Sequence, residues 1–160
     1  MNSIDFKAFE LAIENIKQTT LAKVGAEDAA YIRTIIRRQR YCEWGGRILL
    51  MCGLIHPAMW GIGVLLLALA KILENMEIGH NVMHGQYDWM NDPYINSQKF
   101  EWDIACDGAS WNRVHNFEHH TYTNVIGKDR DFGYGLLRLS SDFKWRIKNL
   151  WQFITYLNLS

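Results

Sequence analysis

The feature that most constrains this chain is an apolar run without a formal charge, which extends over 23 residues from Ile48 to Ala70. Because a helix rises ~1.5 Å per residue, about 20 apolar residues suffice to cross the hydrocarbon core of a bilayer. The run lies too far from the first residue, and is too long, to be the apolar core of a signal peptide. It therefore predicts a membrane-spanning helix, with a buried core helix as the alternative interpretation.

Basic residues flank this run on both sides. Five arginines stand against one acidic residue over residues 33–47, and seven basic residues stand against four acidic ones over residues 113–148. Such an excess marks the cytoplasmic side of a membrane, so two cytoplasmic flanks require an even number of crossings.

Two topologies are weighed for the apolar run. His56-Pro57 is a point at which a tight turn would split it into a helical hairpin, with legs over residues 41–55 and 58–78. These legs are short, and the first contains Glu43 and Arg47, which favours a single pass instead. Both the hairpin and the single pass stay open at this point.

The rest of the chain also has helical patterns. Apolar residues at helical spacing predict an amphipathic helix over residues 4–18, and a basic helix is expected over residues 26–40. Asn91-Asp92-Pro93 is a turn signal. Residues 145–159 become increasingly apolar with Trp and Tyr, as at the entry to a further membrane helix.

These patterns predict an all-α fold, part of an integral membrane helical bundle. Residues 1–47 form a cytosolic amphipathic and basic region in this interpretation, and residues 48–160 form the main domain. Seventeen basic and seventeen acidic residues cancel, so net charge does not support a nucleic-acid partner. The three cysteines (Cys42, Cys52 and Cys106) form no CxxC pair, which favours a reducing compartment.

Five of the six histidines fall in two clusters. His80 and His84 are four residues apart, so both imidazoles share one face of a helix, and His115 and His119 repeat this spacing. His120 is rotated by ~100° from His119 on an α-helix and is available to a second metal. Because neutral imidazole is a common metal ligand, the two clusters predict a metal site. His56 stands alone in the apolar run, which favours a structural role.

The surrounding residues narrow the metal chemistry. A zinc protease of the HExxH type needs a glutamate after the first histidine, where this chain has Asn81 and Asn116. A carboxylate-rich di-iron site needs repeated Glu-x-x-His pairs, and only Glu77 with His80 matches. The pattern therefore favours an imidazole-rich site beside a membrane helix, suited to non-haem iron and O₂.

The residues around both clusters resemble the membrane fatty acid desaturase family, and most closely its bacterial linoleoyl-CoA-desaturase-like branch. The matching segments are residues 79–93 (GHNVMHGQYDWMNDP), 101–103 (EWD) and 111–135 (WNRVHNFEHHTYTNVIGKDRDFGYG). The first cluster, over residues 80–84, matches the HxxxH box of the family. The second, over residues 115–120, matches its HxxxHH box.

The resemblance implies a centre with two iron ions at the cytoplasmic side of a membrane. The iron ligands that it implies are His80, His84, His115, His119 and His120. Glu118, Asp129 and Asp131 are candidates to orient these imidazoles, and Trp102 and Trp111 to line an acyl channel.

The resemblance also implies an activity. The family consists of O₂-dependent oxidoreductases that introduce a double bond into the acyl chain of an acyl-CoA or acyl-lipid. Electrons would come from a separate donor protein, of the ferredoxin/reductase or cytochrome b5 type, because no haem-binding His-Pro-Gly-Gly motif is present. Membrane lipid is the other expected partner, and membrane is the expected location.

One departure from the family stands out. The family carries a third histidine box downstream, and no histidine follows His120 in this chain. We therefore expect the chain to match the N-terminal portion of a desaturase, truncated before the third box, and to be inactive alone. Three other interpretations are a hydroxylase of the same superfamily, a non-enzymatic metal-binding membrane fragment and a zinc-dependent membrane hydrolase. The last is least favoured, because no glutamate directly follows His80 or His115.

Overall fold

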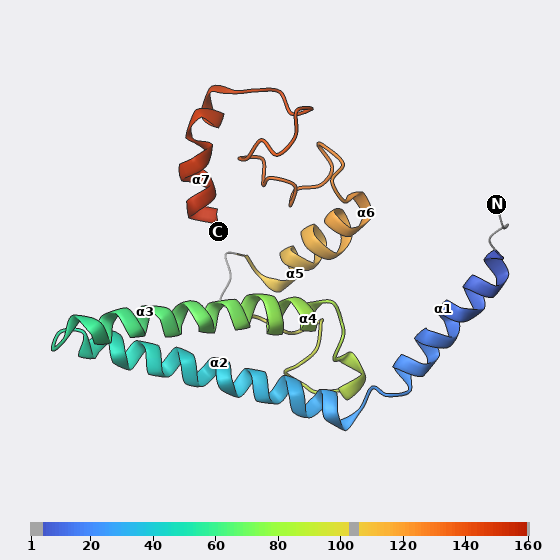
Figure 1. The fold of residues 1–160 in the computed structure, drawn as a ribbon, viewed down its shortest axis with the longest axis horizontal. Helices are drawn as coiled ribbons and strands as arrows, with labels where there is room; N and C mark the ends of the chain where they lie inside the picture. The colour runs from blue at the N-terminus through green and yellow to red at the C-terminus, as the bar shows by residue number, and fades with distance from the viewer. Residues whose placement is uncertain (1–4, 103–105, 160) are drawn as a thin grey trace. The chain divides into compact units, whose positions relative to one another are not determined.

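The computed structural model describes residues 5–102 and 106–159 of the chain. Within these ranges the chain forms helices and turns and no β-strand, in agreement with the predicted all-α class (Figure 1). It divides into two compact units, Met1–Ile78 and Gly79–Ser160.

The first unit begins with α1 (Phe6–Leu21), which covers the predicted amphipathic helix except residue 4, which lies outside the described residues. Asp5 caps this helix, because its carboxylate accepts hydrogen bonds from the backbone N–H groups of Lys7 and Ala8, each at 3.1 Å. No residue of α1 is buried. Its apolar stripe is therefore exposed within this chain.

The two long helices of the first unit form an antiparallel hairpin (Figure 1). They are α2 (Ala26–Cys52) and α3 (Pro57–Ile72). Their backbones approach closely at two glycines: a Cβ atom on Gly63 would lie 3.0 Å from the carbonyl oxygen of Gly46 and 2.9 Å from the backbone nitrogen of Leu50. Such glycine contacts are typical of helices that pack inside membranes.

The uncharged run from Ile48 to Ala70 does not form one helix. α2 ends at Cys52, and α3 begins at Pro57, where the missing N–H of proline costs nothing. His56 is extended, as the residue before a proline prefers, and its Nδ1 accepts a hydrogen bond from Ala58 N–H at 3.2 Å. The break lies where the hairpin interpretation expected it.

The segment after α3 remains helical. A π-helix, η1 (Leu73–Gly79), follows directly and leads into α4 (His80–Met83). Together these segments give the one helix among the described residues that is long and apolar enough to cross a membrane, Pro57–Met83. In α3 only Gly63 and Ala70 are buried, which is unlike the core helix of a soluble protein.

The second unit carries both histidine clusters. After α4, a short 3₁₀ helix, η2 (Asp88–Met90), ends at Asn91, which adopts a left-handed conformation with φ 50°. Asp92 then accepts a hydrogen bond from Tyr94 N–H at 2.9 Å, which confirms the predicted turn. The carboxylate of Asp88 closes the loop by accepting from Ser97 N–H and Ser97 Oγ at 2.7 and 2.6 Å.

The second histidine cluster lies on a continuous helical rod. It consists of α5 (Gly108–Trp111), the π-helix η3 (Asn112–His119) and α6 (His120–Tyr122). Asp107 caps its start by accepting from Ser110 N–H at 2.8 Å. After a long loop, η4 (Ile147–Trp151) and α7 (Gln152–Leu159) occupy the stretch expected to begin a further membrane helix, and Trp151 and Phe153 are exposed there.

Candidate metal centre

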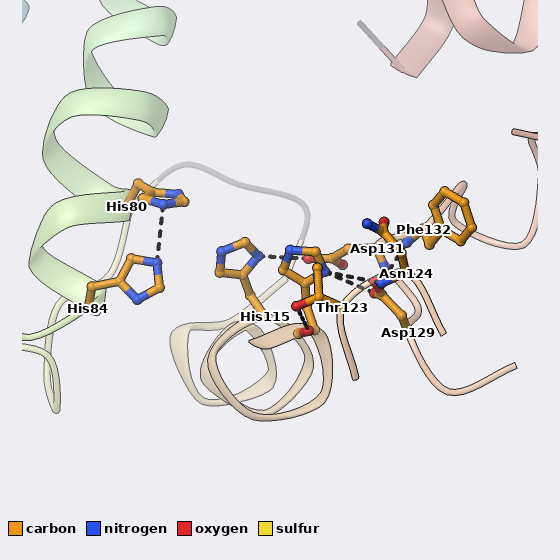
Figure 2. A network of polar contacts seen from close by, with 9 residues as sticks. His80, His84, His115, Thr123, Asn124, Asp129, Asp131 and Phe132 are labelled. Carbon is orange, nitrogen blue, oxygen red and sulfur yellow. Dashed lines mark hydrogen bonds and ion pairs between the residues drawn. The ribbon is translucent and has the colours of Figure 1, made fainter. Parts of the chain in front are cut away.

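The first pair of histidines lies at the end of the long apolar helix. His80 opens α4, and the backbone N–H of His84 donates to the carbonyl oxygen of His80 at 3.1 Å, so one α-helical turn separates the two side chains. The predicted shared face is confirmed, because the two Nε2 atoms lie 3.1 Å apart (Figure 2). Val82 and Met83, between them in sequence, are buried.

The second cluster departs from α-helical geometry. His120 N–H donates to the carbonyl oxygen of His115, five residues earlier, as in a π-helix. In such a helix residue i+5 lies nearer to residue i than it does in an α-helix, and His120 lies within the cluster. Its ring centroid lies 5.1 Å from that of His115 and 4.8 Å from that of His84.

All five predicted ligand residues come together in one cluster within the second unit. His115 is central: its ring centroid lies 5.0 Å from that of His80, 5.4 Å from that of His84 and 5.1 Å from that of His119. One nitrogen from each of His80, His84 and His115 lies within 4.8 Å of the others, a spacing that could hold a metal ion. Three imidazole nitrogens are a common ligand set for transition metals.

Two carboxylates support the second cluster from outside. Asp131 Oδ2 lies 2.7 Å from His115 Nδ1 (Figure 2). Both oxygens of Asp129 lie 3.0 Å from His119 Nδ1. A carboxylate only accepts hydrogen bonds, so each Nδ1 carries a proton, and in the neutral ring the lone pair is then on Nε2. A carboxylate behind a histidine is the usual support of a metal-binding imidazole.

The chemistry of the free nitrogens fits a metal. His115 Nε2 is buried and has no hydrogen-bond partner in the described part of the chain, although buried polar atoms almost always have one. A metal ion in contact with the lone pair would satisfy this atom. The residues present thus fit the metal that the sequence predicts.

The electrostatics of the cluster favour a neutral imidazole at His84. Burial first, and then the neighbouring His80, His120 and His115, lower the pKa of His84 to about 4. His84 is therefore neutral at pH 7, and the neutral imidazole is the form that binds metals.

Asp129 stabilises the loop that follows α6. Its carboxylate is buried and accepts from the backbone N–H groups of Asn124, Asp131 and Phe132 at 2.7, 2.9 and 3.2 Å. Burial opposes the charged form, but the hydrogen bonds from Asn124 and His119 hold the pKa of Asp129 below its usual value. Asp129 and Asp131 thus lie where ring-orienting carboxylates were expected, and Glu118 does not: its partners are Arg130 and Arg113.

Aromatic side chains border the centre. The indole of Trp111 stacks on His115 with a centroid distance of 4.3 Å and an angle of 25°, and Trp102 packs edge-on against Trp111 at 5.5 Å. Of the two tryptophans predicted to line an acyl channel, Trp111 therefore lies beside the histidine cluster, and Trp102 contacts Trp111. Whether an acyl chain contacts them stays a prediction.

Asn116 is a residue of the site that the sequence patterns did not reveal. Its Nδ2 donates to the carbonyl oxygen of Met83 at 2.8 Å and to Asn112 Oδ1 at 2.7 Å. It thereby ties η3 to the end of α4, next to both clusters. In the sequence, Asn116 was noticed only because it stands directly after His115, where a zinc protease would have glutamate. Its structural role could not be predicted, because the two groups that it contacts are known only from the structure.

Known proteins are similar to almost the whole chain. An NADPH-dependent stearoyl-CoA 9-desaturase of Mycobacterium tuberculosis (strain ATCC 25618 / H37Rv) is 44% identical over 154 residues, which are 96% of this chain. An sn-1 linoleoyl-lipid 6-desaturase of Synechocystis sp. (strain ATCC 27184 / PCC 6803 / Kazusa) is 29% identical over 70% of this chain. No family model and no solved structure matches the chain.

The chain spans only 36% of the length of the mycobacterial relative and 31% of that of the cyanobacterial one. These shares agree with the expectation that it matches one portion of a desaturase. The sequence similarity and the clustered histidine boxes lead to one assignment: the chain belongs to the fatty acid desaturase family and corresponds to about a third of its relatives' length.

Proposed function

We propose that this chain supplies part of the metal centre of an O₂-dependent fatty acyl desaturase. The observation that carries the proposal is the cluster of five imidazoles, two of which are hydrogen-bonded to carboxylates through Nδ1. The proposed iron ligands are His80, His84, His115, His119 and His120. Two iron ions, when bound, would supply the oxidising power that an unactivated acyl C–H bond requires.

The chain's own residues prepare the site for these ions. Asp131 and Asp129 hold the protons of His115 and His119 on Nδ1 and aim the Nε2 atoms at the cluster. Trp111 covers one face of His115 and limits the contact of this ring with water. The result is a set of neutral nitrogen donors that is arranged before a metal binds.

Substrate and electron source follow from the names of the relatives. One relative is named for stearoyl-CoA and NADPH, and another for a linoleoyl lipid. We therefore assign to the whole protein an acyl-CoA or acyl-lipid substrate, with electrons passed from NADPH through a separate electron-donor protein of the ferredoxin/reductase or cytochrome b5 type.

We assign the protein to a membrane, with the histidine boxes on the cytoplasmic side. Support comes from the apolar helix Pro57–Met83, from the exposed side chains of α3 and from the basic flanks of the apolar run. For the hairpin of α2 and α3 we propose two crossings, with the turn over residues 53–56 on the opposite side, although of the two helices only α3 belongs to the span that is long and apolar enough by itself.

A chimera tests the proposal without assuming where the protein ends. The aligned segment of the mycobacterial stearoyl-CoA 9-desaturase is replaced by this chain and expressed in membranes with iron, NADPH and stearoyl-CoA. We expect oleoyl product and close to two irons per chimera. His115→Ala should abolish the product, because loss of one ligand disrupts the reactive centre rather than weakening it slightly.

His56→Ala is the matched control, because His56 caps α3 outside both clusters and should leave product formation intact. A membrane-inserted chimera that lacks iron and product would contradict the proposal. A hydroxylated product instead of an alkene would assign the chain to the hydroxylase alternative.

A further inference from the structure

Glu118 is a mostly buried carboxylate that the metal site does not use directly. It lies in η3 between His115 and His119, and its side chain is 14% exposed. A carboxylate removed from water in this way needs a cationic partner. Its Oε2 lies 2.9 Å from Arg130 Nε, and its Oε1 lies 3.6 Å from Arg113 Nε.

The two arginines occupy different elements. Arg113 belongs to η3 itself, so its contact with Glu118 stays within one helix. Arg130 belongs to the loop that follows α6, and it stands in sequence between Asp129 and Asp131, the two carboxylates behind the rings. The Glu118–Arg130 pair therefore links the ligand-bearing helix to the loop that orients its ligands.

The Glu118–Arg130 pair also reduces the repulsion between the carboxylates around η3. Glu118, Asp129 and Asp131 all lie close to η3, and without a cation three carboxylates would repel one another. Arg130 stands between the two aspartates of the loop, and its guanidinium reaches Glu118 at hydrogen-bond distance. The pair thus holds the loop against η3 at a fixed register, with one aspartate on each side of the arginine.

From this arrangement we propose that Glu118 is a positioning residue: through Arg130 it places Asp129 and Asp131 so that the Nδ1 atoms of His119 and His115 keep their protons. The metal-binding lone pairs are thereby fixed on Nε2. Glu118 is not a ligand itself. The consequence for metal affinity rests on the proposed function, whereas the effect on the two protonation sites does not.

The test reads the imidazole tautomers directly in the metal-free chain. The 160-residue chain, labelled with ¹⁵N-histidine in lipid nanodiscs, is compared with Glu118→Gln and Arg130→Gln by two-bond ¹⁵N–¹H NMR. We expect His115 and His119 to be protonated at Nδ1 in the original chain and to show mixed tautomers in both variants. The affinity for Co²⁺ should fall by about 10-fold or more, as is usual when the partner behind a ligating histidine is lost.

Two variants separate positioning from simple stabilisation. Arg113→Gln removes the other cation near Glu118 without cutting the link to the loop, so it should leave both tautomers unchanged. The exchange Glu118→Arg with Arg130→Glu restores the pair in reverse and should recover the Nδ1 tautomers. Helical circular dichroism checks that each variant is folded, and Arg130→Lys replaces Arg130→Gln if that variant unfolds.

The inference is overturned if folded Glu118→Gln and Arg130→Gln keep both Nδ1 tautomers, or if Arg113→Gln disturbs them equally. It is also overturned if the original chain lacks these tautomers. An inactive chimera together with the expected tautomer changes would instead contradict the proposed function alone.

Discussion

His56 differs in its structural role from the other five histidines of the chain. It lies outside both clusters, and its Nδ1 accepts from Ala58 N–H at 3.2 Å at the start of α3. His56→Ala should lower the free energy of unfolding by about 0.5–1 kcal/mol, because an N-cap is lost. Metal content should not change. Unfolding in mixed detergent micelles and metal analysis measure the two effects.

His56→Ser is the companion variant, because serine is a good N-cap and should recover most of the lost stability. Loss of bound metal in His56→Ala, with the helices intact, would show that His56 belongs to the metal centre after all.

For single residues, the sequence predicts which side chains belong to the site better than it predicts which groups they contact. The spacing of the histidines and the two aspartates after them identified the residues that the structure brings together. The sequence did not show which acidic residue contacts a histidine, because Glu118 and Asp129 both lie near the second histidine cluster. Only the folded loop decides that Asp129 faces His119 whereas Glu118 faces Arg130.

The α2–α3 hairpin depends on the glycines at its contact. Gly63→Ala places a methyl group 2.9 Å from the backbone nitrogen of Leu50 and 3.0 Å from the carbonyl oxygen of Gly46, which is too close without a backbone shift. We expect a loss of about 1–3 kcal/mol in hairpin stability from this overpacking. Titration of helicity with sodium dodecyl sulfate in mixed micelles measures it.

Gly61→Ala is the matched control on the same helix, because a methyl group there meets nothing within 4 Å. It should leave stability unchanged or raise it slightly, since alanine favours helix more than glycine. Equal destabilisation by both substitutions would contradict the proposed role of the close contact.

The sequence predicted the helices and the turn that depend on local residue patterns. It did not predict the segments in which the backbone changes from α-helix to π-helix. Helical spacing located α1, and the His56-Pro57 dipeptide located the break after α2. The π-helices η1 and η3 have no period that a search for α-helical spacing would find. The wider π-helix, which the α-helical spacing did not predict, is what brings His120 close to His115.

For the whole molecule, the membrane topology gives a further prediction. In a cysteine-free background, single cysteines are placed at the native position 106, which is exposed, and at Leu54→Cys in the turn, where the side chain is 89% exposed. Two crossings by the proposed hairpin would put these positions on opposite sides of the membrane. In sealed inverted vesicles, an impermeant maleimide should label Cys106 and spare the residue at position 54.

Detergent opening of the vesicles should make both positions reactive, which controls for local burial. Labelling of both positions in sealed vesicles would exclude the two crossings and require another arrangement for the exposed side chains of α3.

The backbone bond from His120 to His115 has a consequence for how this segment can change in evolution. Because the wide turn sets the relative directions of three proposed ligands, the number of residues in this segment matters more than their identity. A substitution at Phe117, whose side chain is 62% exposed, should be neutral for the centre. Deletion of the same residue would turn His119 and His120 about the helix axis relative to His115. Homologous sequences should therefore vary freely at this site by replacement and almost never by insertion or deletion.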